Sequence, residues 1–113
     1  MSQSAIEEIE LNIKEAKKMV DLGKALDRLH SNRDFKKVIG EGFFKDEAVR
    51  LVHLKSDPSM QSEEHQEAVA KQMDSIGGLV HYFRTVAHRA MLAEKAIEAD
   101  EETREELLAE ELD

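Results

Sequence analysis

A heptad pattern of apolar residues in the C-terminal half of the chain most constrains its fold. From Val69 to Ala90 these residues alternate at spacings of four and three, and Ile97 lies one heptad further on. This spacing places side chains on one face of an α-helix that packs along its length. It predicts a helix over about residues 62–110, with Ser62 as its N-cap. The stripe consists of Val69, Met73, Ile76, Val80, Phe83, Ala87, Ala90 and Ile97.

A second amphipathic pattern occupies the N-terminal part of the chain and predicts a helix over about residues 4–30. The segment from Ser4 to Glu7 matches a capping box, so Ser4 is expected to begin this helix. The apolar residues recur at spacings of three and four, as in Ile6, Ile9, Ile13, Ala16 and Val20.

Two short helices, at about residues 33–39 and 45–56, are predicted between the long ones. Ser31 and Asn32 favour a helix stop and a new cap, and Ser56, Asp57 and Pro58 form the next stop, because proline disfavours the α conformation in the residue before it. Gly40 and Gly42 are expected to turn the chain between the short helices, with Gly40 at a helix C-terminus where positive φ is common. The Phe-rich passage from Phe35 to Phe44 would then form an elbow.

Two adjacent glycines, Gly77 and Gly78, interrupt the long C-terminal pattern. A glycine inside a helix costs about 1 kcal/mol relative to alanine. We expect the helix to continue through them, with or without a mild kink, and another backbone to approach closely at this point.

Composition supports an all-α protein. The 113 residues are 41% hydrophobic and 36% charged, with one proline and no cysteine. A chain rich in alanine, leucine, glutamate and lysine favours helices, and the lack of cysteine excludes disulfides and thiolate metal sites. Two long helices in so short a chain rarely bury all their apolar faces alone. A helical bundle is therefore expected, with a homo-oligomer or a constant partner.

The negative charge is concentrated at the C-terminus. Residues 98–113 contain nine acidic residues and one basic residue, whereas residues 1–97 are almost neutral. This predicts a helical domain at 1–97 and an acidic, helix-prone tail at 98–113. Binding of nucleic acid by the tail is disfavoured, because phosphate contacts need clustered Lys and Arg.

No catalytic, cofactor or metal motif stands out, so a non-enzymatic protein without a small-molecule substrate is predicted. His81 and His88 share a helix face but lie too far apart to chelate one ion alone, and no HExxH is present. The first residues lack a basic region followed by an apolar run, so a secretory signal is not expected. No apolar stretch approaches the ~20 residues that span a bilayer.

Between residues 26 and 97, an N-x-D-F-x-x-x-I-x-x-G-aromatic element precedes an E-A-x-R-L helix and a D-P break. This pattern resembles that of small helical proteins encoded by tailed bacteriophages. The resemblance implies a phage product in the host cytoplasm or the virion, with other virion proteins as partners, and transfers no catalytic residue. The matching residues are Asn32, Asp34, Phe35, Ile39, Gly42, Phe43, Glu47, Ala48, Arg50, Leu51, Asp57 and Pro58.

These patterns favour a structural or assembly protein that acts through helix-mediated contacts, such as a head, neck or internal virion component. The alternative is an acidic helical inhibitor that occupies a host nuclease or other DNA-binding protein. A small terminase-type DNA binder would need more basic residues around Lys36 and Lys37. The acidic tail is either a solvated helix or a segment that docks through its leucines. The predicted contact residues are Phe43, Phe44, Val80, Phe83, Ala87, Leu107, Leu108 and Leu112.

Overall fold

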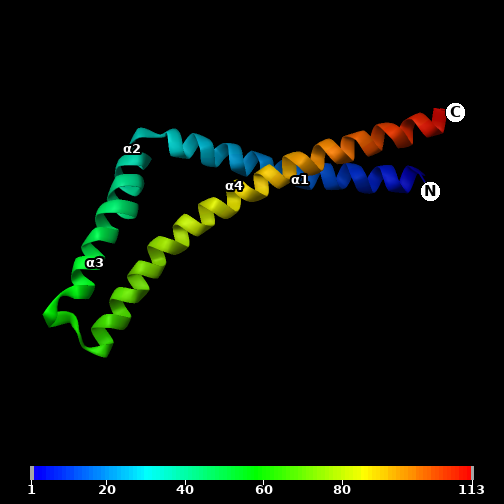
Figure 1. Ribbon diagram of the computed structural model, residues 1–113. Helices are drawn as coiled ribbons and strands as arrows, with labels where there is room; N and C mark the ends of the chain where they lie inside the picture. The colour runs from blue at the N-terminus through cyan, green and yellow to red at the C-terminus, as the bar shows by residue number, and fades with distance from the viewer. Residues whose placement is uncertain (1, 113) are drawn as a thin grey trace. The chain divides into compact units, whose positions relative to one another are not determined.

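The protein has an all-α fold over residues 2–112, the part that the computed structural model describes (Figure 1). No strand occurs in that range. This confirms the predicted class and the two long helices. The elements are α1 (Ser2–Ser31), α2 (Arg33–Phe35), the π-helix η1 (Lys36–Glu47), α3 (Ala48–Ser56), the 3₁₀ turn η2 (Pro58–Met60) and α4 (Glu63–Leu112).

The predicted helix stops are confirmed by side-chain caps. Asn32 begins the helical run to Ser56, since its side-chain Oδ1 accepts a hydrogen bond from the Phe35 N–H at 2.9 Å. Ser62 begins α4 by accepting from the His65 N–H at 3.1 Å. The capping box at Ser4 is wrong as a helix start, because α1 already begins at Ser2 and Ser4 lies inside it. Helix caps of this kind satisfy amides that lack a partner within the helix.

The turn expected at Gly40 and Gly42 is absent. The backbone stays helical from Arg33 to Ser56, and no glycine in residues 2–112 has a positive φ. The two short helices are instead joined by the π-helix η1, whose i→i+5 hydrogen bonds make each turn wider than in an α-helix. The Phe-rich passage is therefore a widened helix rather than an elbow.

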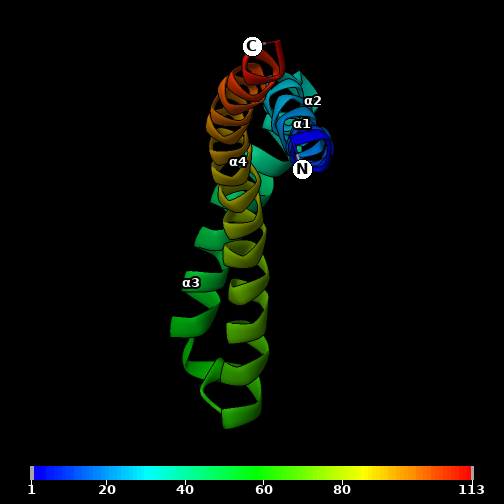
Figure 2. The ribbon, with the colours of Figure 1, turned by 90° about the vertical axis from the view of Figure 1, so that its right-hand side faces the viewer.

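The chain divides into two compact units, which differ from the predicted domains. The first unit combines Met1–Leu26 with Thr85–Asp113, and the second is Asp27–Arg84. The tail residues 98–112 are the end of α4 and belong to the first unit. The blue part of α1 and the orange part of α4 lie side by side there (Figure 2).

The first unit is a pair of antiparallel helices with a thin apolar seam. Gly23 is buried, and a Cβ atom added to it would collide with the Cβ of Ala90. The helices therefore approach most closely where both side chains are smallest. This fixes the register, and equal steps along both helices bring Ile6 level with Leu107. The other buried residues of this seam are Ile6, Ile13, Leu26, Val86 and Ala93.

The second unit has its own core between α3 and the first half of α4. Leu51, Val69 and Ile76 are buried there. Glutamine side chains hold the intervening turn, since Gln66 Nε2 donates to the carbonyl oxygens of Lys55 at 3.0 Å and Met60 at 2.8 Å. The half-buried residues that pack on this core are Phe43, Phe44, Ala48, Leu54, Met60 and Met73.

The inward face of α4 departs from the predicted stripe at one place. Ala87 was expected to face inward, but it is exposed and Val86 is buried instead. The stripe thus steps by three residues from Phe83 to Val86 before it resumes at Ala90. Such a change in spacing rotates the inward face around the helix, because three residues are less than one α-helical turn.

Gly77 and Gly78 also differ in part from expectation. The helix α4 does continue through them, as predicted. No atom lies within 4 Å of a Cβ added at either position, so the expected close approach is wrong there. The close approach occurs at Gly23, where the pattern raised no expectation.

Candidate protein-interaction surface

All five Phe and Tyr residues of the chain gather in one cluster in the second unit. Phe83 on α4 lies at its centre, with ring centroids 5.2 Å from His30, 5.9 Å from Phe35 and 6.0 Å from Phe44. The contacts are edge-on or tilted, as aromatic quadrupoles prefer. We call this group the aromatic cluster; it consists of His30, Phe35, Phe43, Phe44, Tyr82 and Phe83.

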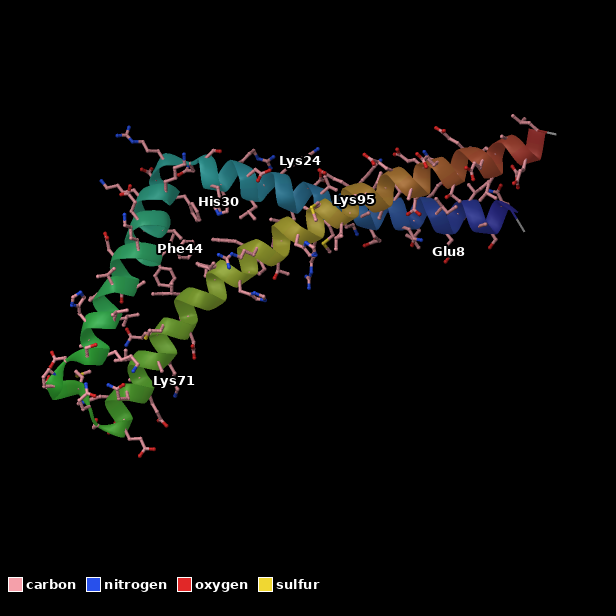
Figure 3. The ribbon with its side chains drawn as sticks, in the orientation of Figure 1. Glu8, Lys24, His30, Phe44, Lys71 and Lys95 are labelled. Atoms are coloured by element: carbon pink, nitrogen blue, oxygen red, sulfur yellow. The ribbon has the colours of Figure 1, made fainter. Side chains whose placement is uncertain are left out.

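The π-helix places two of these rings on one face. Phe35 and Phe44 are nine residues apart, yet both contact Phe83. In an α-helix nine residues make two and a half turns, which would put the rings on opposite faces. With i→i+5 hydrogen bonds a turn takes between four and five residues, and nine residues make about two turns. Phe44 accordingly points toward α4 (Figure 3).

No residue of the aromatic cluster is fully buried, although the rings pack on one another. The four Phe residues are half-buried and Tyr82 is 54% exposed. Phe43 and Phe44 both pack against the Leu51 core. An apolar cluster that keeps one side in solvent is a common feature of protein-binding surfaces.

The cluster contains three of the predicted contact residues, and Val80 lies half-buried one turn before Phe83 on α4. Sequence reasoning missed His30 and Tyr82 as members, and it placed Phe35 in the elbow with Phe43 and Phe44 without counting it among the contact residues. A usable signal was present, because the apolar residues of this passage recur every four or five positions, as in Phe35, Ile39, Phe44 and Ala48. That period fits a π-helix better than an α-helix.

The predicted tail contacts do not form one docking face. Leu107 is half-buried and lies level with Ile6 in the first unit, whereas Leu108 is 44% and Leu112 89% exposed. Leu107 thus helps to cover α1, which leaves two leucines for any outside partner. Ala87, the last of the predicted contacts, is exposed on α4.

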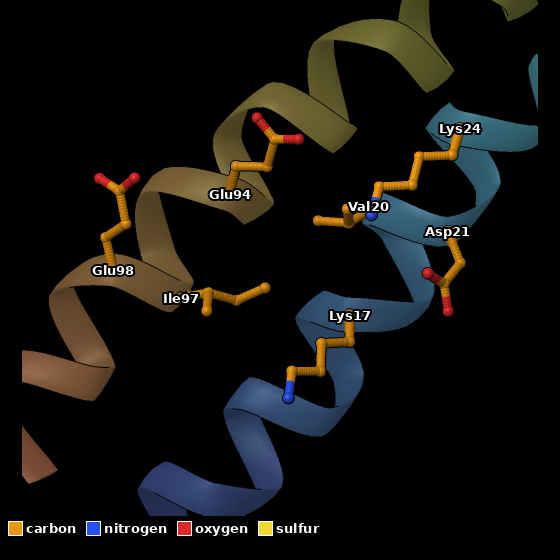
Figure 4. Close-up of a pocket in the computed structure, with 7 residues that line it drawn as sticks. All are labelled: Lys17, Val20, Asp21, Lys24, Glu94, Ile97 and Glu98. Carbon is orange, nitrogen blue, oxygen red and sulfur yellow. The ribbon is translucent and has the colours of Figure 1, made fainter. Parts of the chain in front are cut away.

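The first unit has a shallow charged groove of about 450 Å³ between α1 and α4 (Figure 4). Its floor is formed by Val20 and Ile97, which extend toward each other. Within the described part of the chain no ion pair joins its lysines to its glutamates. The groove is open and its charged ends reach solvent, so it presents no enclosed ligand site. The charged residues of its rim are Lys17, Asp21, Lys24, Glu94 and Glu98.

Other kinds of site receive no support from the geometry. Residues 2–112 contain no group of three or more His, Asp or Glu side chains close enough to hold a metal ion. No helix in the same range is long and apolar enough to cross a membrane. No protein-family model, curated protein or solved structure matches the chain. The aromatic cluster is therefore the best candidate for a functional surface.

Proposed function

We propose that the protein is a non-enzymatic helical assembly or structural protein that self-associates through the aromatic cluster. The observation that carries this proposal is the gathering of all five Phe and Tyr rings into one cluster, in which the phenylalanines are half-buried and Tyr82 is exposed. Fold stability alone favours complete burial of such rings, which remove a large area from water. Aromatic anchors that retain exposure in one chain are well suited to burial against a second.

The charge distribution favours a second copy as the occupant of this surface. The first unit carries fifteen acidic and seven basic residues, whereas the second carries ten acidic and nine basic residues. Two copies that meet through their second units avoid most of the like-charge repulsion that their first units would produce. The near-neutral unit is also the one that holds the aromatic cluster.

The resemblance to small helical phage proteins supplies the biological setting of the proposal. In that setting the self-associated protein contacts other virion proteins in the head, the neck or the interior of the particle. The alternative, an acidic inhibitor that imitates DNA, requires carboxylates over the whole surface. The second unit is almost neutral, which disfavours that alternative.

Self-association is tested by substituting two residues of nearly equal exposure, one inside the aromatic cluster and one outside it as a control. Tyr82 in the cluster is 54% exposed and Val52 on the outer face of α3 is 53% exposed. We expect light scattering at micromolar to millimolar concentration to report a dimer or larger species for the native chain and for Val52→Arg. Tyr82→Arg should be monomeric with an unchanged helical circular dichroism spectrum. A compact native monomer throughout this range would contradict self-association.

The biological setting is tested by quantitative mass spectrometry of purified particles from the source phage. Many copies per particle would support a structural component. Absence from particles, together with specific binding to a DNA-binding host protein that DNA displaces, would favour the inhibitor instead.

A further inference from the structure

The π-helix η1 is unusually long and is held by contacts outside itself. π-Helices occur mostly as single turns within α-helices, often at functional sites. Here the π-helix covers twelve residues, Lys36–Glu47. Neither Gly40 nor Gly42 requires this conformation, because both have ordinary helical φ values. The reason for the π conformation therefore lies in the side chains.

The aromatic side chains share one face only at the wider period, although the apolar Val38 within η1 is 63% exposed. Five of the six charged residues of η1 are exposed. Glu47 is half-buried, as are Ile39, Phe43 and Phe44. At 3.6 residues per turn, Phe35 and Phe44 would lie on opposite faces, so one ring would leave the cluster. The exposed charged residues are Lys36, Lys37, Glu41, Lys45 and Asp46.

η1 has more residues than an α-helix would need to make the same ring contacts. If two residues were absent, Phe35 and Phe44 would be seven apart, which is about two α-helical turns. An ordinary α-helix would then present both rings to Phe83. The segment thus contains two residues more than an α-helix with these contacts needs.

We infer that η1 is a conformational switch between π- and α-helical forms. In the π form both Phe35 and Phe44 contact Phe83. In the α form Phe35 stays in place and Phe44 turns to the solvent side. In this change each backbone N–H exchanges an i→i+5 partner for an i→i+4 partner. The switch therefore controls whether the Phe44 ring packs in the aromatic cluster or is exposed to solvent.

This inference does not depend on self-association and is tested on the full-length chain by deletion. A chain that lacks Glu41 and Gly42 should form an α-helix there and be at least as stable as the native chain. The matched control lacks Glu41 alone and carries Gly42→Ala. It removes the same glycine but places Phe35 and Phe44 eight positions apart rather than seven. We expect the control to unfold at lower urea concentration. A two-residue deletion that is no more stable than the control would overturn the inference.

The switching itself is measured through Phe44→Trp, which is a unique reporter because the chain has no tryptophan. Acrylamide should quench its fluorescence at least twofold more strongly in the full-length chain than in the two-residue deletion. A second readout avoids the larger ring. Amide hydrogens of residues 43–47 should exchange at least tenfold faster in the native chain than in the deletion. Equal exchange rates in the two chains would rule out a switch.

Discussion

At the scale of single residues, the smallest side chains decide where helices meet. Gly23 lets α1 approach Ala90 of α4 at a distance that no larger side chain permits. Gly77 and Gly78 look more prominent in the sequence, but both have open space around them. The same residue type is thus required at one position and unfavourable at two others.

Alanine substitutions should show this contrast directly. Gly23→Ala is expected to lower the free energy of unfolding by about 1–3 kcal/mol, because the new methyl group overpacks the seam. Gly77→Ala should raise it by about 0.5–1 kcal/mol, because it adds helix propensity without a clash. Urea unfolding followed by circular dichroism measures both.

The double variant Gly23→Ala with Ala90→Gly provides the control. Like the native chain, it has a single methyl group at the crossing point, but on α1 instead of α4. It should recover much of the stability that Gly23→Ala loses. A Gly23→Ala protein as stable as the native chain would show that the two helices can move apart without cost.

Within the aromatic cluster, Phe83 should matter more than its neighbour Tyr82. Phe83 contacts His30, Phe35 and Phe44, whereas Tyr82 contacts only the ring of Phe83 within the described cluster. Phe83→Leu is expected to cost about 1–3 kcal/mol through lost ring contacts and imperfect packing. Tyr82→Leu should change stability by less than about 1 kcal/mol. Equal losses in thermal or urea unfolding would argue against a central role for Phe83.

At the scale of elements, polar capping residues fix where helices begin and end, whereas the apolar pattern predicts only their approximate extent. Asp57 caps the turn η2, where its Oδ1 accepts hydrogen bonds from the Ser59 N–H at 2.8 Å and the Ser59 hydroxyl at 2.7 Å. These hydrogen bonds lower the pKa of the Asp57 carboxyl below its ordinary value of 3.8. The carboxylate, rather than the protonated acid, is therefore the form that the turn stabilises.

Because folding lowers this pKa, the cap stabilises the protein above the unfolded pKa of about 3.8 and loses its effect as the pH falls through the lower folded value. Asp57→Asn keeps a capping oxygen but cannot ionise. It should be less stable than the native chain at pH 7, and the difference should shrink towards zero on acidification below about pH 4. Urea unfolding at both pH values measures this change.

The exposed Asp46, which makes no hydrogen bond in the described structure, supplies the control. For Asp46→Asn we expect little difference from the native chain at either pH. If the Asp57→Asn difference stayed constant between pH 7 and the acid range, the Ser59 hydrogen bonds would not favour the ionised carboxylate.

The elements also show which features sequence reasoning can recover. Ser31, Asn32 and Pro58 act through local hydrogen bonds or local sterics, so the stops they predict are confirmed. The path through Gly40 and the inward position of Val86 depend on what the neighbouring helix presents. A period of 3.6 residues per turn places Phe35 and Phe44 on opposite faces, so a pattern read at that period reveals neither the π-helix nor the face that the two rings share.

The candidate surface could be predicted only in part, because some of its residues are close in the sequence and others are not. The concentration of phenylalanine in one passage identified Phe43 and Phe44 as important. Phe83, the partner of Phe44, lies about forty residues further along the chain, and only the return of α4 brings it near. Long-range pairings of this kind are not encoded in local spacing.

At the scale of the whole molecule, charge and apolar contacts are distributed differently between the two units. The first unit holds most of the net charge and a narrow apolar seam, whereas the second holds the aromatic rings and the most deeply buried side chains. The acidic end of α4 is not simply a solubilising extension. By the register at Gly23 and Ala90, it lies beside the first turns of α1 and covers Ile6.

A chain that ends at Ile97 should therefore lose protection at the opposite end of the sequence. We expect amide hydrogen exchange to become at least tenfold faster over residues 6–13, where Ile6 and Ile13 would lose cover, while amides around Leu51 keep their protection. The control is the full-length double variant Leu108→Gln and Leu112→Gln, which alters only exposed leucines. If exchange near Ile6 did not change on truncation, residues 98–113 would contribute nothing to the seam.

The location of the rings also decides what optical methods can observe. Tyr82 is the only tyrosine and the chain has no tryptophan, so absorption at 280 nm and intrinsic fluorescence arise from the second unit alone. Backbone circular dichroism, in contrast, records the helices of both units. A melting curve followed by tyrosine fluorescence does not detect the separation of α1 from the end of α4. The two curves coincide only if both units unfold in one cooperative transition.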